Sequence, residues 1–356
     1  MKKKSTLFMH EFRIAIGFLI VGLIAVAFIC YAVSGDLAEA VSYGNFYGNS
    51  NVTINGRFSA WISNIEFVLF AGIAAFVVCQ FASVRSGNTS QFLSVLPIKK
   101  TTTFFMKIGV GLGTITIPYL FLLLGMAVLH EQYFDKIMKL FVCSDSFSLA
   151  YRNDSFLTLF FQWLLFYLFA VALYLLFVLM ETLVYKQAAA IGLGIAAAVA
   201  PAGVFSAIVS LFARYDLEPS ENVLSVGSLT TVFTGGATFD GFYGMYGDMT
   251  TGVSCEAPGA KVFLLFLLIL AFGGGAFLAW SRHDESKSSM AIPRKGIRIA
   301  LFISVMVCLV VVALYFLLMP EQMTKGIIIG GMIAIILLAV AAYVLYRILL
   351  RKKEVQ

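Results

Sequence analysis

The sequence contains eight apolar runs, each long enough to cross a lipid bilayer as a helix. A membrane-spanning helix needs roughly 20 consecutive apolar residues. Hydrophobic residues make up 60% of this 356-residue chain and charged residues only 12%, far from the composition of soluble globular domains. We therefore predict an all-α polytopic membrane protein, a single transmembrane domain over 1–356 whose spans are 14–33, 61–84, 108–129, 158–180, 188–213, 261–280, 299–319 and 326–346.

The distribution of lysine and arginine predicts how these spans are oriented. An even number of spans places both termini on one side, and cytoplasmic segments of membrane proteins carry an excess of basic residues. If the termini are cytoplasmic, only seven of the 25 basic residues lie outside: Arg57, Lys136, Lys139, Arg152, Arg214, Lys261 and Lys325. The net charge of +6 is then explained by orientation in a cell membrane, and no nucleic-acid partner is needed.

Larger outer loops are expected at roughly 34–60, 130–157 and 214–260. Cys143 and Cys255 fall in two of these loops, on the oxidising side of the membrane. Two interpretations stay open, because the pair can form a disulfide or remain as two free thiols. The other three cysteines lie within spans, where small buried thiols are ordinary: Cys30, Cys79 and Cys308.

The chemistry of an enzyme is missing from the sequence. No G-x-x-x-x-G-K-[ST] phosphate loop occurs, and the chain has no Gly-Lys pair at all. His10-Glu11 and His130-Glu131 begin like a zinc-protease motif but lack the second histidine four positions on. We therefore expect no catalytic activity, no metal and no cofactor in this chain.

Glu66 is the clear charged residue inside a predicted span. It follows Trp61 by five residues, which places it only about 7.5 Å deeper at a helical rise of ~1.5 Å per residue. Two interpretations stay open: a shallow carboxylate that reaches headgroup water, or a polar contact on a substrate path. Ion-coupled carriers use charged or unwound sites near the midplane, and these spans offer almost none, so the driving force is expected to come from elsewhere.

Small residues and prolines mark special positions in the spans. Gly109 and Gly113 form a small-xxx-small pair, which allows close helix contact either within the chain or with a partner. Pro118 is expected to kink or interrupt its helix, which neighbouring helices in a membrane can tolerate.

The basic segment 85–107, between the second and third spans, contains Arg85, Lys99, Lys100 and Lys107 and no acid. Phe92, Leu93 and Leu96 share one face of a short predicted helix that Pro97 ends. The threonines at 101–103 can cap a second helix that continues into the third span. On physical grounds alone the segment can lie on anionic lipid headgroups.

The stretch SVLPIKKTTTFFMKI at 94–108 resembles the loop between spans two and three of ABC transporter permeases of the ABC-2 type. The resemblance includes the basic N-terminal segment KKKSTLFMHEFR at 2–13, a long outer loop before the sixth span and a charged tract, SRHDESKSSMA, at 281–291. It covers the layout of roughly the first 290 residues. The chain exceeds the common six-span plan by two C-terminal spans, as in some larger permeases of Gram-positive bacteria, which implies the bacterial cytoplasmic membrane.

The resemblance implies that the 85–107 loop is a coupling loop, which docks on a separate ATP-binding subunit that binds ATP and Mg. Phe92, Leu93 and Leu96 would then enter a groove of that subunit, Pro97 would fix the turn, and Lys99 and Lys100 would contact its surface or headgroups. A second permease copy or a related permease would complete a transporter that exports a peptide, lipid-like or drug-like substrate. The alternatives are a secondary carrier or channel for a neutral solute, and a non-transporting sensor or immunity protein.

Overall fold

The computed structural model describes residues 2–47, 54–85, 99–141, 156–184, 186–187, 189–198 and 258–282, with single residues between 299 and 343. These residues are helical apart from a few at helix ends, and no strand occurs among them. The predicted helical class is therefore confirmed for the described part of the chain. Two compact units are formed, one by 1–182 and 235–283 and the other by 183–234 and 284–356.

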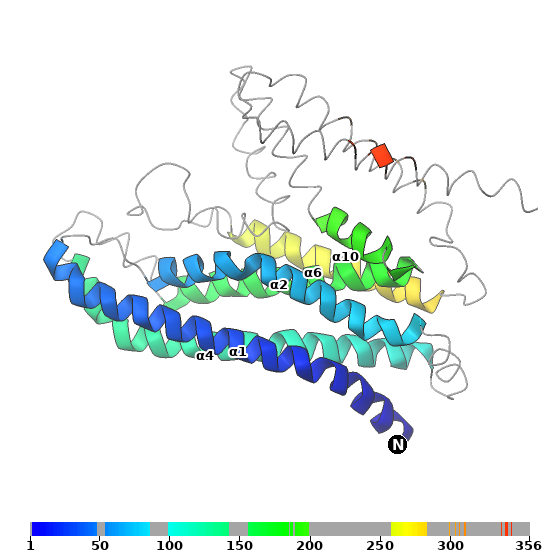
Figure 1. Ribbon diagram of the computed structural model, residues 1–356, viewed down its shortest axis with the longest axis horizontal. Coiled ribbons are helices and arrows are strands. Elements are labelled where there is room, and N and C mark those ends of the chain that lie inside the picture. The colour runs from blue at the N-terminus through cyan, green and yellow to red at the C-terminus, as the bar shows by residue number, and fades with distance from the viewer. Residues whose placement is uncertain are drawn as a thin grey trace, which may run out of the picture. The chain divides into compact units, whose positions relative to one another are not determined.

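Five long helices are described, and they form the bundle that is analysed below (Figure 1). Their bounds are α1 Lys2–Tyr47, α2 Ile54–Arg85, α4 Lys100–Phe141, α6 Phe156–Leu183 and α10 Pro258–Ser281. Four contain a segment long and apolar enough to cross a membrane: Phe8–Ser42, Lys100–Lys139, Trp163–Leu183 and Val262–Ser281. Such segments are those of a membrane protein, as the composition predicted.

The other predicted spans are described in part. The run 61–84 lies within α2, and 188–213 is helical over Ala189–Ala198. The runs 299–319 and 326–346 lie outside the described residues except for single helical positions. The number of eight spans and the side on which the termini lie stay predictions.

The helices are longer than the predicted spans. α1 has 46 residues, about 69 Å of helix at ~1.5 Å per residue, whereas the hydrocarbon layer is about 30 Å thick. The expectation of loops at 34–60 and 130–157 was wrong over 34–47, 54–60 and 130–141, which are helical. Apolar side chains continue at helical spacing beyond the spans there, and they pack against one another.

This packing forms one hydrophobic cluster, which joins α1, α2, α4 and α6 at the end of the bundle where α1 ends and α2 begins. We call it the outer cluster, after the side on which the sequence predicts this end to lie; its buried members are Ile29, Val33, Leu37, Ile54, Phe58, Leu122, Met126, Leu129, Ile137, Met138, Trp163 and Phe166. The Trp61 Nε1 donates a 2.8 Å hydrogen bond to Asp36 Oδ2, and Arg57 Nη1 lies 3.8 Å from the same oxygen. Apolar burial and these polar contacts together keep the extended helix ends ordered.

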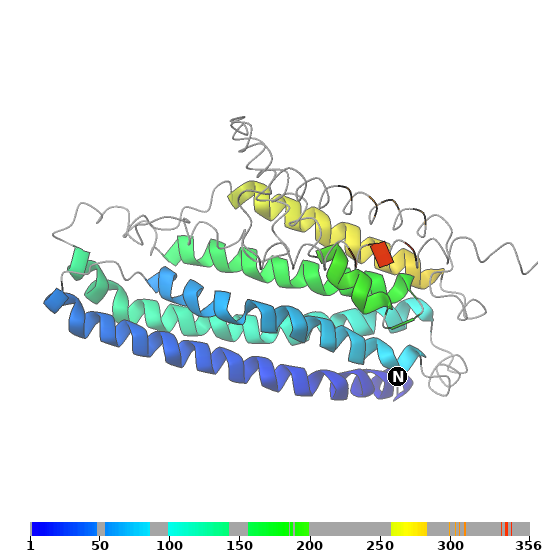
Figure 2. The ribbon, with the colours of Figure 1, turned by 45° about the horizontal axis from the view of Figure 1, so that its top comes forward.

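α1 and α4 lie side by side along the bundle, as both views show (Figures 1 and 2). Pro118 lies inside α4 without interrupting it, contrary to one of the two outcomes expected for it. A Cβ atom added at Gly22 of α1 would lie 2.9 Å from Pro118 Cγ. A glycine at 22 therefore lets α1 approach the proline ring closely.

Candidate functional site

The predicted coupling loop, 85–107, begins at Arg85, where α2 ends, and its residues 100–107 form the start of α4. Its expected contact residues Phe92, Leu93, Leu96 and Pro97 lie outside the described residues. Lys99 and Lys100 are described, and both are exposed. The Lys99 carbonyl accepts hydrogen bonds from the amides of Thr102 and Thr103 at 2.9 and 3.2 Å. The helix restart predicted at 101–103 is thus present, beginning at Lys100 so that the threonines form its first turn.

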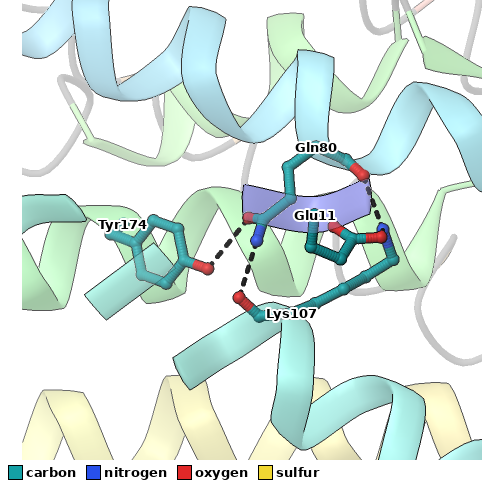
Figure 3. A network of polar contacts seen from close by, with 4 residues as sticks. All are labelled: Glu11, Gln80, Lys107 and Tyr174. Atoms are coloured by element: carbon teal, nitrogen blue, oxygen red, sulfur yellow. Dashed lines mark hydrogen bonds and ion pairs between the residues drawn. The ribbon is translucent and has the colours of Figure 1, made fainter. Parts of the chain in front are cut away.

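A group of four buried polar side chains lies at the base of this segment, and we call it the polar clamp: Glu11, Gln80, Lys107 and Tyr174 (Figure 3). They come from α1, α2, α4 and α6 respectively. Lys107 Nζ lies 2.6 Å from Glu11 Oε1 and donates a 2.7 Å hydrogen bond to the backbone carbonyl of Gln80. The clamp therefore ties four helices together just behind the loop.

Gln80 and Lys107 exchange hydrogen bonds in both directions. While Lys107 Nζ donates to the Gln80 carbonyl, Gln80 Nε2 donates a 2.6 Å hydrogen bond to the Lys107 carbonyl. The Tyr174 hydroxyl donates to the remaining side-chain oxygen of Gln80 at 3.0 Å. Because these hydrogen bonds of Gln80 run to α4 and α6, this residue links the end of α2 to the start of α4 and to α6.

The ion pair of the clamp is excluded from solvent. The side chains of Lys107 and Glu11 are 0% and 2% exposed. Lys107 Nζ also lies 5.4 Å from the centre of the Phe81 ring, where the negative face of the aromatic ring attracts a cation. Glu11 Oε2 has no hydrogen-bond partner among the described residues, so the carboxylate depends on Lys107 for its compensation.

Gly111 makes room for the clamp. A Cβ atom at this position would collide with the hydroxyl and ring of Tyr174, which is fully buried. At Gly109 and Gly113, the small-residue pair in the sequence, an added Cβ atom would meet nothing within 4 Å in the described part of the bundle. Among the described residues the close contact is therefore at the glycine between them, and whether Gly109 and Gly113 contact another part of the chain or a partner stays open.

Aromatic side chains connect α10 to the same end of the bundle. Trp280 Nε1 donates a 2.9 Å hydrogen bond to the Lys100 carbonyl, in the first turn of α4. The Trp280 ring lies 6.0 Å from Phe81 and 5.9 Å from Phe104, measured between ring centres. All five long helices thus meet, through polar or aromatic contacts, near the end of α2 and the start of α4.

Sequence reasoning missed the clamp. It assigned Lys107 to the cytoplasmic loop and Glu11 to a basic N-terminal segment, and gave no role to Gln80 or Tyr174. The available signal was one acid in that basic segment and one lysine directly before an apolar run, charges of opposite sign at the same end of the protein. Glu66 lies in α2, and its side chain is not described; Cys143 and Cys255 lie outside the described residues. Cys30 and Cys79 are free thiols.

A second polar group lies within the apolar part of α4 and α6. The Thr116 and Tyr167 hydroxyls are 2.9 Å apart, and the Tyr119 and Tyr167 rings stack with centres 4.5 Å apart. The buried Tyr119 hydroxyl has no hydrogen-bond partner among the described residues. This uncharged group, which we call the tyrosine pair, can offer hydrogen bonds to a neutral molecule but holds no charge for ion coupling.

The described ranges hold no group of three His, Cys, Asp or Glu side chains that would bind a metal. Comparison with known proteins gives no family, since no family model, no curated protein and no solved structure matches the chain.

Proposed function

We propose that this chain is the membrane-spanning permease subunit of an ABC transporter of the ABC-2 type, in a bacterial cytoplasmic membrane that it crosses several times. A separate subunit would bind ATP and Mg and hydrolyse the ATP. Two copies of the chain, or the chain and a related permease, would form the path through which a peptide, lipid-like or drug-like substrate is exported.

The observation that best supports this proposal is the reciprocal hydrogen bonding of Gln80 and Lys107. A loop that transmits the movement of a partner subunit needs rigidly held ends, because flexible ends would absorb the movement locally. Buried hydrogen bonds are costly to leave unmade. The two ends of 86–98 would therefore move together and take α1, α6 and α10 with them.

The resemblance of 94–108 to the permease loop supports the same interpretation from the sequence. Lys99 and Lys100 are exposed at the start of α4, where a partner surface or anionic headgroups could contact them. Phe92, Leu93, Leu96 and Pro97 would supply the contact that inserts into the partner. The role of these residues rests on the resemblance.

The test is co-purification from the native membrane in mild detergent, with partners identified by mass spectrometry. The chain would be compared with a Leu96→Asp/Lys99→Glu variant and with Lys136→Glu, which makes the same charge change on an exposed residue near the other end of α4. An ATP-binding protein should co-purify with the wild type and with Lys136→Glu, and be lost from the double variant. Recovery of other membrane complexes without any ATP-binding protein would contradict the proposal.

A second candidate function is a secondary carrier for a neutral solute, favoured by the tyrosine pair. Uncharged hydroxyls in the apolar part of the bundle are the kind of group that would contact such a solute. In that case transport would proceed without ATP and would be lost on removing the Thr116 and Tyr167 hydroxyls, whereas changes at 92–100 would leave it intact. A sensor or immunity protein would tolerate both sets of changes.

A further inference from the structure

We infer that α1 is a rod that carries movement of the loop base to the outer cluster, and that the Glu11–Lys107 ion pair is its attachment point. This inference rests on the proposed function, because it concerns how a conformational change of an ATP-binding subunit would be transmitted through the chain. It adds Glu11 and Lys107 as positioning residues.

The clamp has two kinds of link. Neutral hydrogen bonds join α2, α4 and α6, through Gln80 to the Lys107 carbonyl and through Tyr174 to Gln80. The link from the clamp to α1 is the buried ion pair at 2.6 Å. Loss of the Glu11 carboxylate would therefore release α1 from the clamp and leave the other three helices joined.

A buried ion pair is suited to this task because it defines one register. Desolvation of two charges offsets much of their attraction, so such a pair contributes little net stability, but breaking it strands a charge and is strongly unfavourable. Sliding α1 along α4 would separate Glu11 from Lys107, whereas apolar contacts can be exchanged for similar ones. The ion pair therefore fixes the axial position of α1 relative to the start of α4.

α1 can transmit the movement because it is one continuous helix from Lys2 to Tyr47. Glu11 and Asp36 are about 38 Å apart along that helix, at ~1.5 Å per residue. At Asp36 the helix is again fixed, by the hydrogen bond from Trp61 and by the apolar residues of the outer cluster. A displacement applied at Glu11 would therefore reach the opposite end of the bundle.

The experiment measures the outer end of α1 while the ATP-binding partner acts at the other end. A single reporter cysteine is placed at Ser42, an exposed position near the end of α1, with the five native cysteines replaced by alanine. The complex with its co-purified partner is reconstituted into vesicles, and the rate of labelling by a membrane-impermeant maleimide is compared without nucleotide and with ATP plus vanadate.

We expect the labelling rate to change with nucleotide in the otherwise wild-type chain and to lose that change in Glu11→Ala, while the partner stays bound and hydrolyses ATP. Glu11→Gln, which keeps an oxygen to accept from Lys107, should retain part of the response and guards against a variant that merely misfolds. Glu39→Gln, an exposed glutamate on the same helix, should respond as the parent does.

Three results would overturn the inference. A full nucleotide response in Glu11→Ala would show that the ion pair does not carry the movement. An unchanged labelling rate in the parent despite an active, bound ATPase would show that α1 does not transmit the movement, and would not contradict the permease proposal. If no ATP-binding protein co-purifies with the parent chain, the proposed function and this inference fail together.

Discussion

Lys107 and Glu11, 96 positions apart in the sequence, lie 2.6 Å from each other with both side chains excluded from solvent. Few arrangements of two charged residues are as constrained, because each must be compensated by the other or by a fixed dipole. Lys107 has such additional compensation from the Gln80 carbonyl and the Phe81 ring. Glu11 has a second oxygen without a hydrogen bond in the described part of the protein. The Lys107 charge is therefore better compensated than the Glu11 charge, and this difference predicts different stabilities for variants that remove one charge or the other.

Lys107→Met should destabilise the protein more than Glu11→Gln. The first change leaves a buried carboxylate whose compensating cation is gone, and breaking a buried pair in this way costs roughly 3–5 kcal/mol. The second keeps an acceptor for Lys107, which also retains the Gln80 carbonyl. The midpoint of thermal unfolding in detergent, followed by size-exclusion chromatography of heated samples, shows which variant is less stable.

The double variant Glu11→Gln/Lys107→Met provides the control for this pair. Because it removes both charges, it should be more stable than Lys107→Met alone. Equal losses in all three variants would mean that the charges do not interact as the geometry indicates.

Gly111→Ala and Gly113→Ala should change stability in opposite directions. A methyl at 111 would collide with the buried Tyr174, and overpacking of this kind costs about 1–3 kcal/mol. A methyl at 113 meets no atom of the described residues within 4 Å, so the higher helix propensity of alanine, about 0.5–1 kcal/mol over glycine, should dominate. Thermal midpoints of the two variants beside the wild type test this directly.

Adding Tyr174→Ala to Gly111→Ala identifies the cause. The alanine removes both the hydroxyl and the ring carbons that the methyl would meet, so the two changes together should cost less than the sum of the single costs. Strict additivity would place the damage somewhere other than at this contact.

The sequence predicted the helical class because long apolar runs have one stable form in a membrane, the helix that satisfies its own backbone hydrogen bonds. It predicted the start of α4 within a few residues because threonine and proline act locally on the chain. The length of α1 and α4 was not predicted, since their extensions depend on packing of Leu37, Phe58 and Ile137 from three different helices. Local composition there is polar enough to resemble loops.

The clamp could not be found from the sequence for a related reason. Glu11 and Lys107 sit in segments whose other charges are basic, and charge counting treats each residue as belonging to its segment. Pairing requires knowing that α1 and α4 run side by side. The same holds for Gly111, whose neighbour Tyr174 lies on another helix, so that no spacing in the sequence marks this glycine as the one in close contact.

Asp36→Ala should weaken the outer end of the bundle more than Arg57→Ala. Asp36 accepts a 2.8 Å hydrogen bond from Trp61, while Arg57 is 3.8 Å away and its side chain is 40% exposed. Exposed ion pairs contribute about 0–1 kcal/mol, so loss of Arg57 should be nearly neutral. A thermal midpoint for Arg57→Ala as low as that for Asp36→Ala would contradict this account of the contact.

Trp61→Phe extends the same test to the donor. If the Asp36–Trp61 hydrogen bond is responsible, the double variant Asp36→Ala/Trp61→Phe should lose less stability than the two single variants added together. The apolar ring of phenylalanine keeps the aromatic contact that Trp61 makes with Phe28, whose ring centre is 5.7 Å away. The difference between the double variant and the sum of the two single variants therefore measures the contribution of the hydrogen bond.

Removing one hydroxyl from each of two tyrosines separates the polar clamp from the tyrosine pair. The Tyr174 hydroxyl donates to Gln80, and Tyr174→Phe leaves a buried acceptor with one bond fewer, at a cost of about 1–3 kcal/mol. The Tyr119 hydroxyl is buried without a partner in the described residues, so Tyr119→Phe removes a polar group that has no compensation and should be neutral or stabilising. Thermal midpoints of both variants check the expected signs, and a destabilised Tyr119→Phe would mean that this hydroxyl has a partner.

Transport by the same two variants distinguishes the rival proposals. An ATP-driven permease should tolerate Tyr119→Phe and be impaired by Tyr174→Phe, because only the latter weakens the contacts between the end of α2 and the start of α4. A carrier whose solute contacts the tyrosine pair should show the reverse order.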